Sequence, residues 1–288
     1  MSRVHIVTDG SVHFTSSHYL RHYPVHILPL QVRCGGQVVE ESPLNDPVPL
    51  TPFLEPGPEA LSIIPPSVDE FTSLYEELGA QFNQIISIHC SSALNGTYEN
   101  AYAASQRFLG RFDIQVIDSE SVSIGLGMLV QCAMEASARR EKLDAIVRQV
   151  RGRISNLYMV FFLEDLYYLE RNHLISRSQA ILGNMLGIIP FLTMEEGQLV
   201  PMEKVRTRSR AIEKIIEFAC EFNDVHQMGL LQSDITPSPE SRAVSDRLQS
   251  LFPGQRIFIA NYGPLLSSFV GPNSFGIVIL DSLDENNG

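Results

Sequence analysis

The 288-residue chain is short of positive charge. It contains 21 Lys and Arg residues against 33 Asp and Glu residues, which gives a formal net charge of -12. Nucleic-acid affinity depends largely on cationic side chains that neutralise phosphates. This charge balance therefore argues against a nucleic-acid partner.

Long apolar runs are also missing. The segment from Met1 to Gly10 lacks the run of about seven apolar residues that a signal peptide needs. No later segment approaches the roughly 18 apolar residues of a membrane span. We therefore expect a cytoplasmic protein that does not span a membrane. With 44% hydrophobic residues, the chain is long enough for a substantial core and is expected to form two domains.

The motifs of several common chemistries are absent. The sequence has no Gly-Lys-Ser/Thr phosphate loop, no G-x-S-x-G elbow and no HExxH or H-x-E metal spacing. Gly125 and Gly127 lack the third glycine of a dinucleotide-binding fingerprint and lie in a helical pattern, which favours close helix packing. The cysteines have no ligand spacing, so we expect buried reduced thiols and neither a metal nor a cofactor; they are Cys34, Cys90, Cys132 and Cys220.

The first half of the chain alternates short apolar runs with helical patterns. Strands are expected near residues 4–7, 26–32, 84–89 and 114–117. The segment Ser67-Val68-Asp69-Glu70 is a capping box that predicts a helix continuing to Gly79, and further helices are expected at 121–134 and 143–154. This order predicts an α/β domain with a mainly parallel sheet flanked by helices.

The pattern changes after residue 155. A strand is expected at 157–163, followed by helices around 165–170 and 176–186 and a hairpin that pairs 188–193 with 199–204. A long helix at 206–222 and strands near 228–231, 256–260 and 276–280 complete a second α/β layer. We therefore expect an N-terminal α/β domain at 1–155, a C-terminal α/β domain at 156–282 and a frayed tail at 283–288.

One strand-to-helix turn, HCSSALNGTYENA at residues 89–101, is crowded with small polar residues. Asn95, Gly96 and Thr97 stand where the helix is expected to begin, and the free N–H groups there attract a polar or anionic oxygen. Alternatively, Asn95 or Ser92 only caps its own helix. The residues alone leave both interpretations open.

The string SSALNGTY at 91–98 resembles the SSxLSGTY signature of the DegV family, bacterial fatty-acid carriers that include the binding subunit of fatty-acid kinase. Further matches follow in the family's order: TDGS at 8–11, ILPL at 27–30, PS at 66–67 with Phe71, VIDS at 116–119, DLYYL at 165–169, GNML at 183–186, KVR at 204–206 and GP at 271–272. The resemblance implies two α/β domains of DegV type that hold a long acyl chain in a tunnel between them, with its carboxyl group near the turn. It also implies a carrier without catalytic residues, whose lipid a kinase partner phosphorylates.

The sequence departs from the family where the head group is expected. The family's carboxylate-binding Thr falls on Ile63, which Ile64 follows; its LSG serine is Asn95, its GGRIS arginine is Leu174 and its HxGPG histidine is Phe269. Lost hydrogen bonds to a buried carboxylate are costly. We therefore hypothesise a lipid with an uncharged head, or an acid held protonated or by backbone N–H groups near Asn95 and Gly96.

These matches define the candidate ligand-binding residues, which are Ser11, Ile63, Ile64, Ser92, Asn95, Gly96, Thr97, Leu174 and Phe269. Arg206 keeps the family's KVR position. With Lys204, Arg208 and Arg210 it forms a basic strip that either docks an acidic partner, such as a fatty-acid kinase subunit, or is simply a solvated helix start.

Two alternatives compete with the lipid carrier. The first is an enzyme that acts on a bound lipid or small metabolite, with His89 or His173 as base and Ser91, Ser92 or Ser267 as its polar partner. The second is a regulatory protein whose vestigial cavity is filled by Ile63, Ile64 and Phe269. A serine–histidine contact would favour the enzyme.

Overall fold

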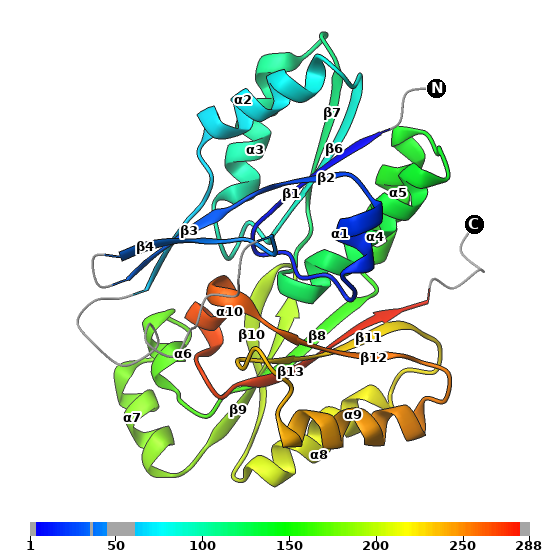
Figure 1. Ribbon diagram of the computed structural model, residues 1–288. Helices are drawn as coiled ribbons and strands as arrows, with labels where there is room; N and C mark the ends of the chain where they lie inside the picture. The colour runs from blue at the N-terminus through cyan, green and yellow to red at the C-terminus, as the bar shows by residue number, and fades with distance from the viewer. Residues whose placement is uncertain (1–3, 35–36, 45–60, 283–288) are drawn as a thin grey trace. The chain divides into compact units, whose positions relative to one another are not determined.

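The computed structural model describes residues 4–34, 37–44 and 61–282. These residues form two compact units (Figure 1). Unit 1 comprises 4–34, 37–44 and 62–155, and unit 2 comprises Leu61 and 156–282. Both units combine a β-sheet with helices, as the α/β pattern predicts.

Unit 1 is built on a parallel sheet with the strand order β2-β1-β6-β7. All five residues of β1 and five of the six residues of β6 are buried, which is typical of a parallel sheet covered on both faces. The predicted parallel sheet is thereby confirmed. The strands are β1 (His5–Asp9), β2 (Val25–Leu28), β6 (Gln84–His89) and β7 (Asp113–Asp118).

Helices flank this sheet, with α2 and α3 on one side and α4 and α5 on the other (Figure 1). Phe71, Tyr75 and Leu78 of α2 pack with Val7 and Ile85 of the sheet into one buried cluster. The elements are α1 (His18–His22), α2 (Val68–Gly79), α3 (Thr97–Ser105), the short 3-10 helix η2 (Gln106–Phe108), α4 (Ser123–Ala138) and α5 (Leu143–Ile154).

The capping box that predicts α2 is confirmed. The Ser67 hydroxyl accepts a hydrogen bond from the Glu70 N–H, and the Glu70 carboxylate accepts one from the Ser67 N–H. The predicted close packing of α4 is also confirmed: a Cβ atom on Gly127 would lie 1.9 Å from the His13 carbonyl oxygen. Only a glycine lets α4 approach the segment after β1 so closely.

A small antiparallel sheet in unit 1 was not predicted from the sequence. It has the order β4-β3-β5, with β3 (Leu30–Cys34), β4 (Gln37–Glu41) and β5 (Ser62–Ile64). The single strand expected at 26–32 is therefore wrong, because β2 ends before Pro29 and β3 begins after it. Proline has no N–H to donate to a ladder, so the chain leaves one sheet there and enters another.

Unit 2 contains a mixed six-stranded sheet with the order β10-β9-β8-β13-β11-β12, in which only β11 and β12 pair in parallel. The predicted hairpin is confirmed: β9 and β10 are joined by Glu196 and Gly197, which both have positive φ angles, as a two-residue hairpin turn requires. The strands are β8 (Leu157–Phe162), β9 (Ile189–Glu195), β10 (Gln198–Val205), β11 (Val225–Gln232), β12 (Ile257–Asn261) and β13 (Phe275–Asp281).

Helices α8 and α9 pack beside each other against the unit 2 sheet (Figure 1). The helix expected at 206–222 is shorter, because the Thr207 side chain caps α8 by accepting from the Arg210 N–H. Helices α9 and α10 were not predicted. The helices are α6 (Tyr167–Arg171), α7 (Arg177–Met185), α8 (Arg208–Ala219), α9 (Pro239–Leu251) and α10 (Gly263–Val270).

The described cysteines only partly fit the expectation of buried thiols. Cys90, Cys132 and Cys220 are all free; Cys90 is buried and Cys132 is half-buried. Cys220 is exposed, so the expectation is wrong there: it follows the last residue of α8 at the surface. Within the described ranges, no helix has the length and apolar character needed to cross a bilayer.

Candidate functional site

Two loops of unit 1 meet at one edge of its parallel sheet. The turn at residues 90–96 follows β6, and Gly10 and Ser11 follow β1, its hydrogen-bonded neighbour. Ligands of α/β proteins commonly bind beyond the carboxyl ends of parallel strands, where such loops converge. The turn predicted from sequence therefore lies at a favourable position.

Asn95 braces this turn from within. Its side-chain oxygen accepts hydrogen bonds from the Thr97 N–H (3.1 Å) and the Thr97 hydroxyl (2.5 Å). Its amide nitrogen donates to the carbonyl oxygen of Ile63 (3.5 Å). Asn95 is only 9% exposed. This geometry matches the interpretation in which Asn95 caps the helix start, although the residue directly before α3 is Gly96.

The segment around Ile63 is held against the same turn. Asn100 of α3 donates to the Pro66 carbonyl (2.8 Å), and Gly96 packs near the ring of Pro65. Ile63 lies on β5 opposite the buried Val32 of β3. The structure thus brings Ile63, Asn95 and Gly96 together, with Ile64 next in the strand.

Asp9 joins the loop after β1 to the turn after β6. Its Oδ1 accepts hydrogen bonds from the Ser11 hydroxyl (2.6 Å) and the Ser11 N–H (3.1 Å). Its Oδ2 accepts from the Cys90 N–H (2.9 Å) and contacts His89 Nδ1 (3.1 Å). Ser11 and the turn are therefore parts of one hydrogen-bonded assembly, and all four residues are buried.

The hydrogen-bond chain continues from His89 into the core. His89 Nε2 lies 2.7 Å from the Ser87 hydroxyl, which accepts a hydrogen bond from the Tyr75 hydroxyl (2.8 Å). A carboxylate only accepts, so we assign the Nδ1 hydrogen to the bond with Asp9 and leave Nε2 to accept from Ser87. Every polar group of the Tyr75-Ser87-His89-Asp9 chain then has a partner.

This Asp-His-Ser connectivity is that of a hydrolase triad, but its setting differs. Ser87 lies within β6 with no exposed surface, and Tyr75 already donates to its oxygen. A nucleophile must reach its substrate, which Ser87 cannot do from this buried position. The hydrogen-bond chain is therefore structural. Both ring nitrogens of His89 are bound to Asp9 and Ser87, and not to Ser91 or Ser92 as the enzyme hypothesis requires.

The Asp9 carboxyl group is electrostatically favoured in its charged form. Burial by itself raises its pKa, but the hydrogen bond from His89 and the electrostatic attraction of that ring lower it, as do the hydrogen bonds from Ser11 and Cys90. The net effect places the pKa of Asp9 below its ordinary value. Asp9 is therefore a carboxylate in the folded protein at neutral pH.

This lowered pKa makes stability depend on pH. The Asp9 contribution is complete above the unfolded-state pKa of about 3.9 and is lost as the pH falls towards the lower folded-state pKa. In urea denaturation from about pH 6 to about pH 3, we expect the unfolding free energy to fall less steeply in Asp9→Asn than in the unchanged protein. Equal slopes in the two proteins would show that Asp9 has a similar pKa folded and unfolded.

The remaining predicted site residues lie apart from these contacts or in unit 2. The Ser92 N–H donates to the Asp118 carboxylate (3.2 Å). In unit 2, Leu174 follows α6 and donates its N–H to the Leu169 carbonyl (2.8 Å), while Phe269 lies in α10. Both of these side chains are half-buried.

Acidic side chains form ion pairs with part of the predicted basic strip. Arg208 pairs with Glu164 (2.8 Å) and Glu240 (2.5 Å), and Arg210 pairs with Glu217 (2.7 Å). These contacts stabilise the start of α8 rather than present free charge. Arg206 precedes the helix and is exposed.

The enzyme hypothesis also named two residues of unit 2. His173 is exposed and has a φ angle of 61°. The buried Ser267 hydroxyl donates to the Gly263 carbonyl within α10 (2.6 Å). Ser267 is therefore engaged with its own helix.

An apolar groove in unit 2 was missed by the sequence reasoning. It has a volume of about 450 Å³ and lies between helices α6 and α7 and the β9-β10 hairpin. The sequence signal for this groove is the set of apolar residues at the end of α7. They remain exposed in the structure, including Leu182 at 60% and Leu186 at 54%. The apolar lining residues are Leu166, Leu169, Ile175, Leu182, Leu186, Ile188, Pro190, Pro201 and Met202.

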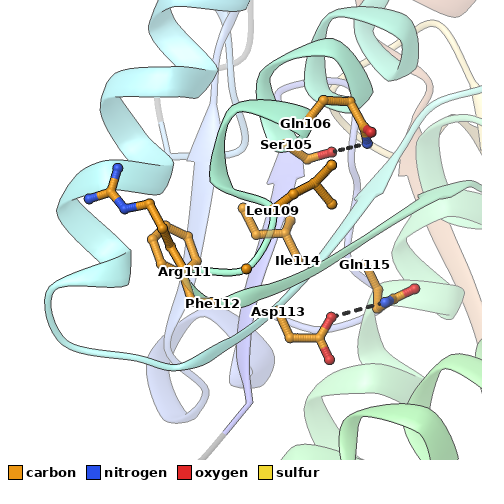
Figure 2. Close-up of a pocket in the computed structure, with 9 residues that line it drawn as sticks. Ser105, Gln106, Leu109, Arg111, Phe112, Asp113, Ile114 and Gln115 are labelled. Atoms are coloured by element: carbon orange, nitrogen blue, oxygen red, sulfur yellow. Dashed lines mark hydrogen bonds between the residues drawn. The ribbon is translucent and has the colours of Figure 1, made fainter.

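Unit 1 has a more polar hollow of about 390 Å³, formed by residues 105–106 and 109–115 (Figure 2). Four of its polar side chains bond in pairs: Gln106 donates to Ser105 and Gln115 donates to Asp113. All of its lining residues come from one short segment of the chain, so we interpret this hollow as a surface depression and not as a ligand site. In the part of the chain that the structure describes, no three His, Cys, Asp or Glu side chains are grouped to hold a metal ion.

Comparisons with known proteins agree with this fold. The family model described as an uncharacterised protein of the DegV family matches residues 3–282. A DegV domain-containing protein of Staphylococcus aureus is 29% identical, and the match covers 97% of this chain and 99% of the relative.

Two solved structures show the same architecture. The fatty-acid-binding DegV family protein of Streptococcus agalactiae has a TM-score of 0.85 at 20% identity, with 98% and 100% of the two chains covered. The fatty-acid kinase B3 protein of Streptococcus pneumoniae, loaded with linoleic acid, has a TM-score of 0.81 at 18% identity, with 98% and 100% covered. The fold and the match over nearly the whole chain lead to one conclusion: this chain belongs to the DegV family.

Proposed function

We propose that this protein binds a long-chain fatty acid or a related acyl lipid and does not itself transform it. Family membership over residues 3–282 carries the proposal, and two similar folds belong to proteins described as fatty-acid-binding or loaded with linoleic acid. The apolar groove of unit 2 offers a surface for an acyl chain, since burial contributes about 0.8 kcal/mol per CH₂. Its volume lies within the range of about 300–1,000 Å³ typical of small-ligand pockets.

For unit 1 taken by itself, the turn is the proposed place for a polar head group. Ser11, Ser92, Asn95, Gly96 and Thr97 supply its polar groups. The Thr97 N–H already donates to Asn95, so the N–H groups of Tyr98 and Glu99 are the first-turn donors of α3 proposed for one ligand oxygen. Ile63 and Ile64 form its apolar side. Leu174 and Phe269 of unit 2 keep their place among the proposed ligand-binding residues.

The carrier role includes a proposed kinase partner. The B3 protein named above is part of a fatty-acid kinase, which supports a partner that phosphorylates a bound acid. On this chain, Arg206 is the proposed docking residue because it is exposed beside the ion-paired Arg208 and Arg210. The alternative enzyme is disfavoured by the engagement of both His89 ring nitrogens with Asp9 and Ser87.

Native mass spectrometry of the purified protein, followed by organic extraction, tests the binding proposal. We expect an added mass corresponding to a long-chain lipid. Leu182→Glu places a charge in the groove and is expected to lower lipid occupancy at least ten-fold, because an apolar chain cannot solvate it. Ser178→Glu, on the same helix but outside the groove lining, is the matched control. Failure to bind any long-chain lipid, as purified or after incubation, would overturn the proposal.

A further inference from the structure

Two exposed histidines lie one helical turn apart on α1. His18 and His22 are the first and last residues of this helix, and both are exposed. Residues four apart share one face of a helix, with one side chain above the other. The two rings are stacked, with 4.1 Å between their centroids and an interplanar angle of 23°. Two imidazoles therefore already lie together at the surface of unit 1.

A hydrogen bond fixes the tautomer of His22. Its Nδ1 lies 2.9 Å from the His18 carbonyl oxygen. A carbonyl oxygen only accepts, so we assign the hydrogen to Nδ1, and the neutral ring then keeps a lone pair at Nε2. Histidines that bind metals commonly donate their other ring N–H in this way, which also orients the ring. His22 therefore has the form that a metal ion requires.

Polar contacts, and not a buried apolar face, hold α1 in place. None of its five residues is buried. The Tyr19 hydroxyl donates to the Glu135 carboxylate of α4 (2.7 Å), and the Tyr23 N–H donates to the Tyr19 carbonyl (3.0 Å). A helix of this length is marginal by itself in water. A ligand that links its first and last residues would therefore stabilise it.

Arg21 lies between the two histidines in the sequence but does not block them. Its guanidinium donates to the Ser17 hydroxyl (2.6 Å), four residues earlier in the chain. The Arg21 side chain is exposed, so solvent and salt screen its repulsion of a cation. Its charge therefore weakens a nearby cation site only modestly.

The imidazole ligands determine the class of metal. Zn²⁺, Cu²⁺ and Ni²⁺ bind imidazole well, whereas Mg²⁺ and Ca²⁺ prefer oxygen ligands. Two ligand nitrogens of a tetrahedral Zn²⁺ site lie roughly 3.3 Å apart, which is close to the spacing of the stacked rings. The string HYLRH at 18–22 keeps the histidine spacing of the HExxH zinc motif without its glutamate.

We propose that His18 and His22 form a two-histidine site for Zn²⁺ or a similar imidazole-binding divalent metal, with water in the remaining coordination positions. The stacked rings, their exposure and the tautomer of His22 carry the proposal. It departs from the expectation, based on cysteine spacing and on the missing HExxH motif, that the chain holds no metal. It does not depend on the proposed lipid binding, because neither histidine is among the proposed ligand-binding residues.

Isothermal titration calorimetry of the full chain with Zn²⁺ tests the site. Cys220→Ser serves as the background, since that exposed thiol is itself a metal ligand. We expect the tightest Zn²⁺ to bind at one per chain and to become at least about ten-fold weaker in His18→Gln or His22→Gln, because either change leaves a single ligand. The double variant should lose little more than either single variant. Unchanged affinity in both single variants, or two independent single-histidine sites, would overturn the proposal.

A matched control keeps the number of histidines and changes only their spacing. Ser17→His combined with His18→Gln places the two histidines five residues apart, about 140° around the helix, where they cannot share one metal. This variant should bind Zn²⁺ as weakly as His18→Gln. In hydrogen exchange, Zn²⁺ should slow the Tyr23 N–H of the background protein but not that of the control. Equal Zn²⁺ affinity of the control and the background protein, or a Tyr23 exchange rate that ignores Zn²⁺, would overturn the proposal.

Discussion

Replacing His89 with leucine is expected to lower the free energy of unfolding by about 3–5 kcal/mol, because it removes one partner of the buried Asp9 carboxylate and leaves that charge with only its bonds from Ser11 and Cys90. His89 and Asp9 are both fully buried and lie 3.1 Å apart between Nδ1 and Oδ2. The substitution also removes the partner of Ser87 at the other ring nitrogen. Denaturant unfolding at neutral pH measures the loss.

Two further variants keep this prediction testable if His89→Leu fails to fold. Asp9→Asn combined with His89→Leu removes the orphaned charge, so the pair should be less destabilising than the sum of the single changes. His22→Leu, on the exposed face of α1, should stay within about 0.5 kcal/mol of the unchanged protein. Simple additivity of the two single changes would indicate that the contact contributes little.

Replacing Gly10 with alanine is expected to cost about 3 kcal/mol or more, at the upper end of the range for overpacked positions. The new Cβ atom would lie 1.8 Å from the Glu41 carbonyl oxygen and 2.9 Å from the Leu30 backbone nitrogen. Both obstacles are main-chain atoms and cannot rotate away. The loop that carries Ser11 would have to move from the small sheet.

The matched control for Gly10 is a glycine with free space. A Cβ atom on Gly152, in α5, meets nothing within 4 Å. Gly152→Ala should therefore raise stability by roughly 0.5–1 kcal/mol, since alanine is the better helix former. Thermal unfolding of the two variants should show shifts of opposite sign, and a Gly10→Ala midpoint equal to that of the unchanged protein would refute the steric argument.

The sequence alone predicted elements whose signals lie within a few residues. The capping box at Ser67, the bounds of α5 and β6 and the pairing of β9 with β10 as a hairpin were all correct. Such features depend on local hydrogen bonds and side-chain periodicity, which a single segment contains. β5 has three residues and α10 has eight largely apolar ones, so neither is long enough to show a reliable period.

In the candidate site, too, features within one segment could be predicted and contacts between distant residues could not. The turn at 90–96 could be located from its composition and from the family resemblance, and its place between β6 and α3 was correct. The role of Asp9 could not be predicted, since it is 80 residues from His89 and meets it only because β1 pairs with β6. The same holds for Glu164 and Glu240, which neutralise Arg208 from distant parts of unit 2.

What the sequence by itself determined is the alternation of strands and helices, the parallel character of the first sheet and the polar strand-to-helix turn. What only the tertiary structure decided is which side chains face one another there: the buried chain from Tyr75 to Asp9, the bond between Asn95 and Ile63 and the apolar groove of unit 2. The physical reason is that local conformation follows from neighbouring residues, whereas contacts between distant residues depend on strand order and register, which no single segment encodes.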